Sequence, residues 1–488
     1  TILIAIGLVL LVLSTSNVID HAGTSLDDEN RANVGNNGAN GANPGTNVAV
    51  GGPESDVKSQ HGLQGFFSSL WKKKTIPFAE TGAAQMLDFH SIMKRISTLP
   101  LGVMSDATKL KLIAGLHRRI DPDNKGLNRA HKYYDSVFEV LTAGKPKMVN
   151  ALERYKSSKR IYHARYEHTP DELDQYMFSE EYLSQFLQLS KQELDAMTKS
   201  HQYVVDNLQD NAPDGLYKGN GIVYVGGGKF NWLTLLSIKL IRAIGSELPI
   251  EVLIPELDEY EPDLCIRVFP ALNARCIYLP HVLSGPTSPT AKIKFKGYQY
   301  KALAMMLLSF ENILLLDSDN IPVHRPDSLF TLEPFVSKGL IVWPDFWRRA
   351  TSPDYYKIAG IQLDTKHLLP RYNEKTGEYE SVPIDTEIED IKDIPMHQRT
   401  GAIPDPTLEL GQLMISKKTH MKALLLALYY NMYGPSHYYP LFLQGSDGEG
   451  DKETFLAATV ALKQPFYQVA KFLNAFGYFN TKHEFVGT

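Results

Sequence analysis

Residues 221–245 read Gly221-Ile-Val-Tyr-Val-Gly-Gly-Gly-Lys-Phe-Asn-Trp-Leu-Thr-Leu-Leu-Ser-Ile-Lys-Leu-Ile-Arg-Ala-Ile-Gly245. The β-branched and aromatic run Ile222–Val225 predicts a short buried strand, and the three glycines after it predict a tight turn. Asn231 suits the N-cap of a helix that Gly245 ends. The apolar residues of that helix fall on one face: Leu233, Leu236, Leu240, Ile241 and Ile244. The segment therefore predicts a strand, a glycine turn and a helix in succession.

Further short apolar runs on the C-terminal side extend this unit into a sheet. A helix is predicted from about Gln299 to Phe310, between the second and third of these runs. The predicted strands are Ile250–Ile254, Cys276–Leu279, Ile313–Leu316 and Leu340–Trp343. Short buried strands that alternate with helices are typical of an α/β fold with a largely parallel sheet. Such sheets bind ligands at the carboxyl ends of their strands.

Composition and charge exclude several classes of protein. The 488 residues carry 50 Lys and Arg against 55 Asp and Glu, a net charge of −5, so bulk charge does not favour binding to nucleic acid. Two cysteines are too few for a Cys-rich zinc module or a disulfide-dense scaffold. Cys265 and Cys276 flank a turn that contains Pro270, and in an oxidising compartment they are predicted to form a disulfide. The alternative is two buried free thiols.

The N-terminal part predicts membrane attachment. Ile2–Leu13 is apolar and uncharged, but a membrane-spanning helix needs about 20 apolar residues. Because residue 1 is Thr rather than Met, we interpret residues 1–18 as the lumenal half of a truncated signal anchor. A cleaved signal peptide is the alternative. Either one directs the rest of the chain into the secretory pathway.

Three further regions follow the predicted anchor. Residues 19–76 are rich in Gly, Asn, Ala and Ser and predict a flexible stem, because they offer almost no apolar surface to bury. A supporting helical region is predicted over residues 77–215, and the domain that contains the predicted sheet over residues 216–488. The apolar residues at helix-like spacing in the helical region are Tyr182, Phe186, Leu187, Leu194 and Met197.

The clearest chemical signal is the run Asn312-Ile-Leu-Leu-Leu-Asp-Ser-Asp-Asn320. A predicted buried strand ends in Asp317 and Asp319, and these two carboxylates point to one side if the extended geometry continues. Hard oxygen ligands of this kind suit Mg²⁺ or Mn²⁺, with a substrate diphosphate completing the coordination. Solvated surface charge is the alternative interpretation.

Glycines and lysines near these strands could bind phosphate. Gly226, Gly227, Gly228 and Lys229 could present backbone N–H groups at a helix N-terminus, although they match neither the dinucleotide nor the Walker spacing. A simple tight turn is the alternative. Four lysines upstream of the aspartates either face a diphosphate or form a solvated strand face: Lys292, Lys294, Lys296 and Lys301.

Two later segments suit sugar binding. Trp343 and Asp345 combine an aromatic face, on which sugar C–H groups can stack, with a carboxylate that can accept hydrogen bonds from hydroxyls. A buried hydrophobic corner is the alternative. The segment Gln444–Glu453 combines three glycines with acidic residues ahead of an apolar helix, and it includes Glu449 and Asp451. The helix dipole alone explains acids there, but not the glycines.

Taken together, these motifs resemble the fungal Golgi mannosyltransferases of glycosyltransferase family 71, and within it the α-1,2-mannosyltransferases that branch the mannan outer chain of yeast N-glycans. The motifs that carry the resemblance are Gly226–Trp232, Lys296–Lys301, Leu315–Val323, Ile341–Arg349 and Gly445–Thr454. The resemblance implies a GT-A-like domain, GDP-mannose as donor and Mn²⁺ (or Mg²⁺) as cofactor. It also implies a single-pass type II Golgi membrane protein with a lumenal catalytic domain.

The resemblance also assigns roles to residues. Asp317 and Asp319 would hold the metal against the diphosphate, Gly226–Lys229 would line the nucleotide site, and Lys301 would help neutralise phosphate. Trp343, Asp345, Glu449 and Asp451 would face the sugars, and the last two would act in catalysis. The motif Pro404–Gln412 adds Glu409 and Gln412 as substrate-binding residues, but it has Leu410 where the family usually has serine. A further metal ligand is expected beyond Thr488.

The expected reaction is transfer of mannose to a mannose 2-hydroxyl of outer-chain mannan, with retention of configuration. An α-1,3-mannosyltransferase of the same family is an alternative. Asp317-x-Asp319 after an apolar strand is also close to the signature of haloacid-dehalogenase-type phosphatases, although that signature normally lies on the first strand of its domain. A non-catalytic Golgi subunit that binds glycans is a third alternative. The sequence makes no prediction about oligomeric partners.

Overall fold

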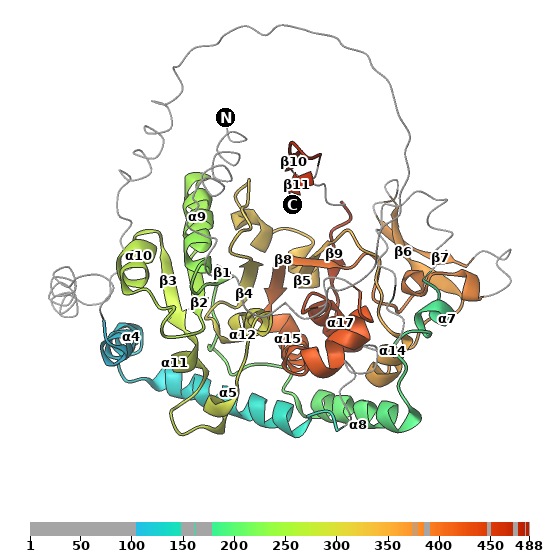
Figure 1. Cartoon of the computed structure of the whole chain (residues 1–488), viewed down its shortest axis with the longest axis horizontal. Helices are drawn as coiled ribbons and strands as arrows, with labels where there is room; N and C mark the ends of the chain where they lie inside the picture. The colour runs from blue at the N-terminus through green and yellow to red at the C-terminus, as the bar shows by residue number, and fades with distance from the viewer. Residues whose placement is uncertain are drawn as a thin grey trace, which may run out of the picture. The chain divides into compact units, whose positions relative to one another are not determined.

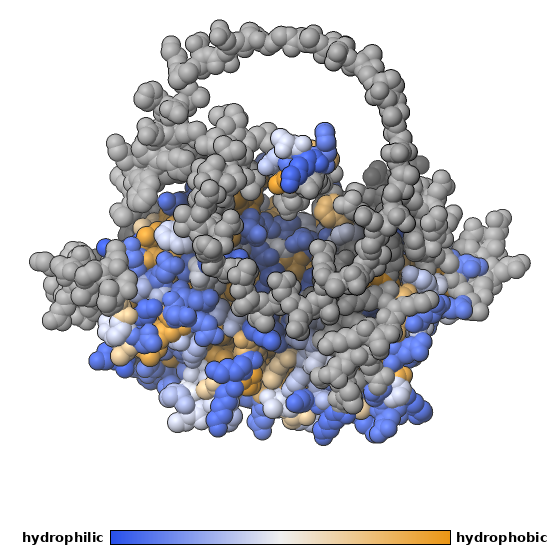
Figure 2. All heavy atoms as spheres, in the orientation of Figure 1, coloured by the Kyte–Doolittle hydropathy of each residue, from blue (hydrophilic) through white to orange (hydrophobic). Residues whose placement is uncertain are grey.

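The computed structural model describes residues 104–147, 161, 178–373, 376, 378–384, 391–446, 450–471, 477–483 and 485–487. The predicted anchor (1–18) and stem (19–76) lie outside the described residues, as do residues 77–103 of the predicted helical region. Within the part of the chain that is described, no helix has the length and apolar character needed to cross a bilayer. Hydrophilic side chains cover most of its visible surface, and hydrophobic ones form small separate areas (Figure 2).

The described chain begins with helices, and between residues 220 and 373 each strand is separated from the next by at least one helix (Figure 1). The helices are α4 (Asp106–Ile120), α5 (Lys125–Ala143), α7 (Glu180–Leu183), α8 (Lys191–Asn207), α9 (Phe230–Ala243), α10 (Phe269–Ala271), α11 (Leu279–Leu283), α12 (Gln299–Leu307), α13 (Phe335–Lys338), α14 (Pro353–Ala359), α15 (Lys417–Met432), α16 (Tyr439–Leu443) and α17 (Thr454–Ala461). The strands are β1 (Asn220–Val225), β2 (Ile250–Ile254), β3 (Ala274–Tyr278), β4 (Asn312–Leu316), β5 (Leu340–Pro344), β6 (His367–Asn373), β7 (Glu378–Pro383), β8 (Leu408–Ser416), β9 (Tyr467–Gln468), β10 (Gly477–Phe479) and β11 (Phe485–Gly487).

A seven-stranded sheet forms the centre of the described chain, with the order β3-β2-β1-β4-β8-β5-β9. Strands β3, β2, β1 and β4 are parallel to one another, and β9 is parallel to β5. Strand β8 runs antiparallel to both β4 and β5. The predicted α/β fold with a largely parallel sheet is therefore confirmed. The reversed strand β8 was not predicted, because its residues were interpreted only as part of a motif.

Each face of this sheet is covered by helices. In β1, Val223 packs into one hydrophobic cluster, which includes residues of α5, α12, α15 and α17. Its neighbours Ile222 and Tyr224 pack into the other cluster, which includes Ile238 and Ile241 of α9. Because both faces are buried, the strands are continuous apolar runs rather than alternating ones, as expected for a parallel sheet between helical layers.

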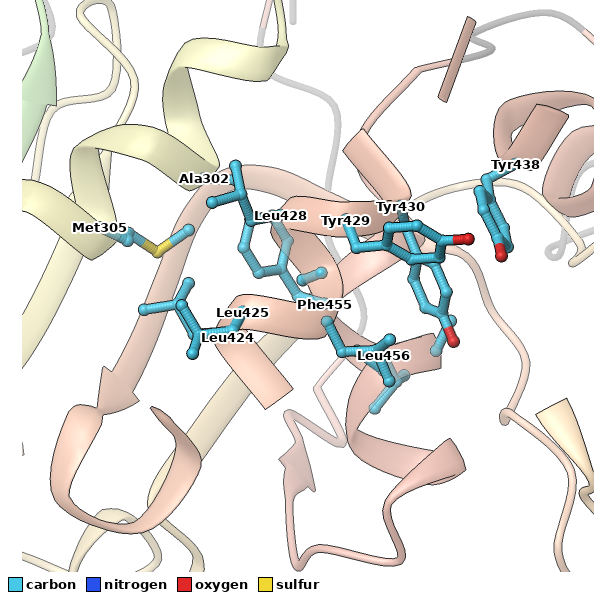
Figure 3. Packing of buried hydrophobic residues seen from close by; sticks show 14 of the residues in the cluster. Ala302, Met305, Leu424, Leu425, Leu428, Tyr429, Tyr430, Tyr438, Phe455 and Leu456 are labelled. Carbon is cyan, nitrogen blue, oxygen red and sulfur yellow. The ribbon is translucent and has the colours of Figure 1, made fainter. Parts of the chain in front are cut away.

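Helix α15 is buried on almost all sides. Figure 3 shows Leu424, Leu425 and Leu428 of this helix in one cluster with Ala302 of α12 and Phe455 of α17. A helix that is apolar all round belongs in the interior of a domain. Its position fixes α12 and α17, and both of these helices adjoin the candidate active site.

The described helices of the predicted supporting region belong to the same hydrophobic core. Phe138 of α5 and Met197 of α8 are buried in the cluster that contains Val223 of the sheet. The predicted helical spacing in this region is divided between α7 and α8, and Leu187 lies in the segment between them. Its backbone N–H donates to Oε1 of Gln444, 2.9 Å away. The limits at residues 77 and 215 remain predictions.

Helix α9 follows the glycine turn as predicted, but its N-terminus and buried face differ from the prediction. Lys229 is the N-cap and no side chain caps the helix, whereas Asn231 is buried in the first turn. The buried residues are Asn231, Thr234, Ser237, Ile238 and Ile241, while Leu233, Leu236 and Leu240 are only partly buried. Thr234 and Ser237 are on the buried face, where leucines were predicted, because their hydroxyls donate hydrogen bonds to the loop after β4. Gly245 ends the helix with φ +91°, as expected.

A disulfide joins Cys265 and Cys276, whose Cα atoms are 5.3 Å apart. Cys276 lies in β3, and Cys265 lies in a π-helical turn, Leu264–Val268, that precedes α10. The bond therefore ties the edge strand of the sheet to the segment that packs beside it.

Replacing both cysteines by alanine is expected to lower the free energy of unfolding by about 3 kcal/mol, because the bond closes a loop of 11 residues in the unfolded chain. Denaturant unfolding checks this value. The unmodified protein under reducing conditions should lose a similar amount. A loss below about 1 kcal/mol in both experiments would contradict the loop-entropy argument.

Candidate active site

The candidate site lies where the strand order reverses. The chain runs outward from β1 through β2 to β3, and β4 then returns to the other side of β1. Ligands of open α/β sheets bind at the carboxyl ends of the two strands at such a point. The glycine turn Gly226–Gly228 follows β1 and Asp317 follows β4, and these two strands are hydrogen-bonded neighbours. Both predicted segments therefore lie at the same edge of the sheet.

The aspartates lie in a turn, not in a continued strand. The Asn320 N–H donates to the Asp317 carbonyl, 2.9 Å away, so the chain reverses directly after β4. The expectation that the extended geometry continues was wrong. Ser318 is buried and donates to the Val225 carbonyl at 2.9 Å, and Thr234 of α9 donates to the Ser318 hydroxyl at 3.1 Å. The turn is thus fastened to β1 and α9, and Asp319 is exposed.

Lys301 of α12 contacts Asp317. Its Nζ lies 2.8 Å from the Asp317 carboxylate and donates to the Leu410 carbonyl at 3.1 Å. Burial raises the pKa of Asp317, while the Lys301 charge opposes this shift and the Asp319 charge adds to it. Burial lowers the pKa of Lys301, but Asp451 and Asp317 together raise it above its ordinary value. Lys301 therefore stays positively charged among the carboxylates.

Asp451 is a deeply buried carboxylate next to Lys301. It is 4% exposed, and its Oδ2 has no hydrogen-bond partner among the described residues. Burial raises its pKa to about 7; the charge of Lys301 opposes this shift, and the charges of Asp317 and Glu409 add to it. An unpartnered carboxylate oxygen in such a place is available to a ligand that donates a hydrogen bond.

The two residues after Asp451 each take a different partner. Lys452 donates to Asp345 at the end of β5, 2.9 Å away, and both side chains are nearly buried. Glu453 forms an ion pair with Arg349 in which both side chains are completely buried. Arg349 also donates to the Pro404 carbonyl at 2.8 Å. These contacts hold the segment before α17 against β5 and the loop before β8.

Replacing Glu453 by glutamine is expected to lower the free energy of unfolding by about 3–5 kcal/mol, because it removes the carboxylate that is ion-paired with the buried Arg349 guanidinium. Denaturant unfolding checks this value. A matched control is Asp195→Asn, which removes the partner of the exposed Lys191 and should cost less than about 1 kcal/mol. Equal losses in the two variants would show that burial of the pair is not what stabilises this segment.

The glycine turn requires its glycines for packing. A Cβ on Gly226 would lie 2.7 Å from Val252 of β2, and Gly227 has φ +107° with the Glu259 carboxylate against it. Asn231 holds the turn closed, because its Oδ1 accepts from the Gly227 N–H at 2.8 Å and its Nδ2 donates to the Glu259 carbonyl at 3.0 Å. The tight-turn interpretation therefore has clear structural support. Binding of a nucleotide by this turn remains a prediction.

The other predicted residues are spread around this centre. Trp343 is half-buried and packs on the hydrophobic cluster of the α9 face. Gln412 of β8 pairs with Leu316, next to Asp317, and Glu409 accepts from the Gly411 N–H at 2.6 Å. Glu449 lies outside the described residues. Lys229 is exposed at the N-cap of α9, where its Nζ is 5.5 Å from the centre of the Phe230 ring.

Of the four lysines upstream of the aspartates, only Lys301 reaches the carboxylates. Lys292, Lys294 and Lys296 are exposed, as the solvated alternative expected, but they lie in a 3-10 turn and a loop rather than on a strand. The Leu410 side chain is buried in the core, and Lys301 contacts only the Leu410 carbonyl. Leucine in place of the family's serine therefore changes the packing of the core, not a side-chain contact with Lys301. Sequence reasoning missed Arg349 and Tyr298, although both lie inside quoted motifs.

The donor set at this edge fits a hard divalent cation. Within the described part of the chain, no three His, Cys, Asp or Glu side chains are grouped closely enough to hold a metal ion by themselves. Asp317 and Asp319 supply two carboxylates, and oxygens from a bound diphosphate would supply others, which is how Mg²⁺ is commonly held. The residues present therefore fit a metal that arrives together with its substrate.

Comparison with known proteins identifies the family. The family model described as "Mannosyltransferase putative" matches residues 219–488, more than half of the chain, and the chain belongs to this family. Similar relatives include alpha-1,2-mannosyltransferase MNN21 of Candida albicans, 59% identical over 369 residues, and alpha-1,2-mannosyltransferase MNN2 of Saccharomyces cerevisiae, 42% identical over 360. These matches cover 74% and 73% of this chain but 56% and 59% of the relatives. The chain thus spans little more than half the length of these curated relatives.

Solved structures give weaker likenesses. The galactosyltransferase LgtC, solved in complex with donor and acceptor sugar analogues, is 13% identical and matches over 51% of this chain and 73% of its own. The TM-score of that match is 0.28, which is too low to support a conclusion about a shared fold.

Proposed function

We propose that this protein is a metal-dependent α-1,2-mannosyltransferase. In this proposal a GT-A-like domain transfers mannose from GDP-mannose to the 2-hydroxyl of a mannose in the outer-chain mannan of an N-glycan, with retention of configuration. Membership of the mannosyltransferase family and the names of the similar relatives support the reaction class.

One observation carries the proposal. The turn with Asp317 and Asp319 lies at the point where the strand order reverses, and Lys301 contacts Asp317 at 2.8 Å. This arrangement offers two carboxylates for a cation and one fixed positive charge at the edge where an α/β sheet binds its ligand. A nucleotide diphosphate matches both features.

Asp317 and Asp319 would hold Mn²⁺ or Mg²⁺ together with the diphosphate. The cation would stabilise the negative charge that develops on the leaving diphosphate. Lys301 adds a positive charge that its carboxylate neighbours maintain, and Gly226–Lys229 line the nucleotide.

The sugar side of the site is formed by the segment before α17. Asp451 accepts a hydrogen bond from a substrate hydroxyl at its unpartnered Oδ2 and orients that hydroxyl for transfer. Asp345, Glu409, Gln412 and Trp343 are assigned to the same side of the site. Glu449 is assigned beside Asp451 on the resemblance alone.

We further propose that the protein is a single-pass type II protein of the Golgi membrane, with its catalytic domain in the lumen. The apolar run Ile2–Leu13 supports attachment at the N-terminal end. The disulfide between Cys265 and Cys276 is consistent with an oxidising compartment.

The test is mannose transfer from GDP-mannose to an α-1,6-mannan acceptor, with Mn²⁺ or with EDTA, using soluble protein from about Pro77. Metal-dependent transfer with an α-1,2 linkage in the product would support the proposal. An α-1,3 product would assign the protein to the other linkage within the family. No transfer by folded, metal-supplied protein would refute the proposed reaction, and release of phosphate from a phosphomonoester would favour the phosphatase alternative.

A further inference from the structure

Tyr298 is an exposed aromatic residue beside the candidate site. It directly precedes α12 and is 58% exposed. Single exposed hydrophobic side chains are common on protein surfaces, so the exposure of Tyr298 does not by itself indicate a ligand. What distinguishes this ring is its place beside the candidate site.

Helical spacing and one contact place this ring beside the site. Tyr298 lies three residues before Lys301, so both side chains are on the same face of the helix, and Lys301 contacts Asp317. On its other side, the Tyr298 ring packs on buried Gly450, because a Cβ at that residue would lie 3.4 Å from two of the ring carbons. An alanine at position 450 would place its Cβ in van der Waals contact with the ring.

Gly450 precedes Asp451, whose Oδ2 is buried without a hydrogen-bond partner among the described residues. The ring therefore borders a place that holds both an unpartnered acceptor and the positive charge of Lys301. A sugar ring matches such a pair of groups, since its C–H face stacks on an aromatic ring while a hydroxyl donates to the carboxylate.

We infer that Tyr298 is a stacking residue for a mannose ring of the acceptor. The inference rests on the proposed function and extends it by one residue. Asp317 and Lys301, which are assigned to the donor diphosphate, are largely shielded from solvent, with 34% and 16% of their side chains exposed. Tyr298 is the most exposed of the three residues. A polymeric acceptor must reach the site from the side that is open to solvent.

Kinetic constants of the Tyr298→Ala variant test this role, with the full chain and saturating Mn²⁺. The KM for an α-1,6-mannan oligosaccharide should rise about tenfold, while kcat and the KM for GDP-mannose stay unchanged. Tyr298→Phe should behave as the unmodified protein, because stacking does not need the hydroxyl. Tyr203→Ala removes a tyrosine of α8 that is 41% exposed, and it should leave all constants unchanged.

A binding measurement separates this inference from the proposed reaction. In Tyr298→Trp, titration with the same oligosaccharide should change the tryptophan emission more than in the unmodified protein. Such a change without any mannose transfer would support the stacking role and refute the proposed reaction. A rise in the KM for GDP-mannose alone would assign Tyr298 to the donor and overturn the inference. Unchanged acceptor KM in Tyr298→Ala, or no emission change in Tyr298→Trp, would also overturn it.

Discussion

Asp319→Asn is expected to reduce mannose transfer about 1,000-fold, the upper end of the range for loss of one group that stabilises transition-state charge. The substitution removes one of the two carboxylates assigned to the cation in the turn after β4. Because Asp319 is exposed, the free energy of unfolding should change by less than about 0.5 kcal/mol. Initial rates at several Mn²⁺ concentrations, together with a thermal unfolding curve, measure both effects.

A matched control for this variant is Asp195→Asn, which alters an exposed carboxylate of α8 far along the chain from the turn. It should retain full transfer. If Asp319→Asn also keeps its activity and its Mn²⁺ dependence, the turn after β4 does not hold the cation and the proposed role of both aspartates is wrong.

Asp451→Asn is expected to abolish most transfer and at the same time to stabilise the protein above neutral pH. Burial raises the pKa of Asp451 from 3.8 to about 7. Between these values the folded protein binds a proton that the unfolded chain does not, so this carboxylate lowers stability as pH rises through that range. Above pH 7 the full penalty is about 4 kcal/mol, at roughly 1.4 kcal/mol per pKa unit.

Unfolding curves at pH 5 and pH 8 in EDTA test this prediction, because a bound cation would itself stabilise the carboxylate. The unmodified protein should lose more stability between these pH values than Asp451→Asn does. Identical pH dependence in the two proteins would contradict the raised pKa. Full transfer by the variant would remove Asp451 from the proposed site.

Much of the central sheet was predictable because its strands are buried on both faces. The predicted Ile250–Ile254 coincides with β2, and the predicted Ile313–Leu316 lies within β4. Such apolar runs need no knowledge of tertiary contacts. Strand β8 was harder to predict from the sequence, because its reversed direction and its position between β4 and β5 are set by long-range pairing.

The buried face of α9 shows where sequence patterns are insufficient. Leucine spacing predicted one face, but the helix buries Thr234 and Ser237 instead. Thr234 donates to Ser318 at 3.1 Å, and Ser237 donates to the Asn320 carbonyl at 2.6 Å. Polar side chains are buried where partners exist, and partners 84 and 83 residues away leave no periodic signal. The same reason hid the pairing of Lys452 with Asp345 and of Glu453 with Arg349.

The candidate site likewise contains residues that the sequence predicts and contacts that it does not. Asp317 and Asp319 were recognisable because they follow an apolar strand directly. The isolation of the Asp451 Oδ2 and the packing of Tyr298 on Gly450 depend on segments about 150 residues apart in the sequence. No local pattern reports them.

The core shared by α5, α8 and the sheet has a consequence for how relatives could exchange parts. The family match begins at residue 219, but Phe138 and Met197 fill the same hydrophobic cluster as Val223. A chimera joined at residue 219 would place two independently varied halves of one interior against each other. Recombination between relatives should therefore succeed only when the helices before β1 travel with the sheet that they cover.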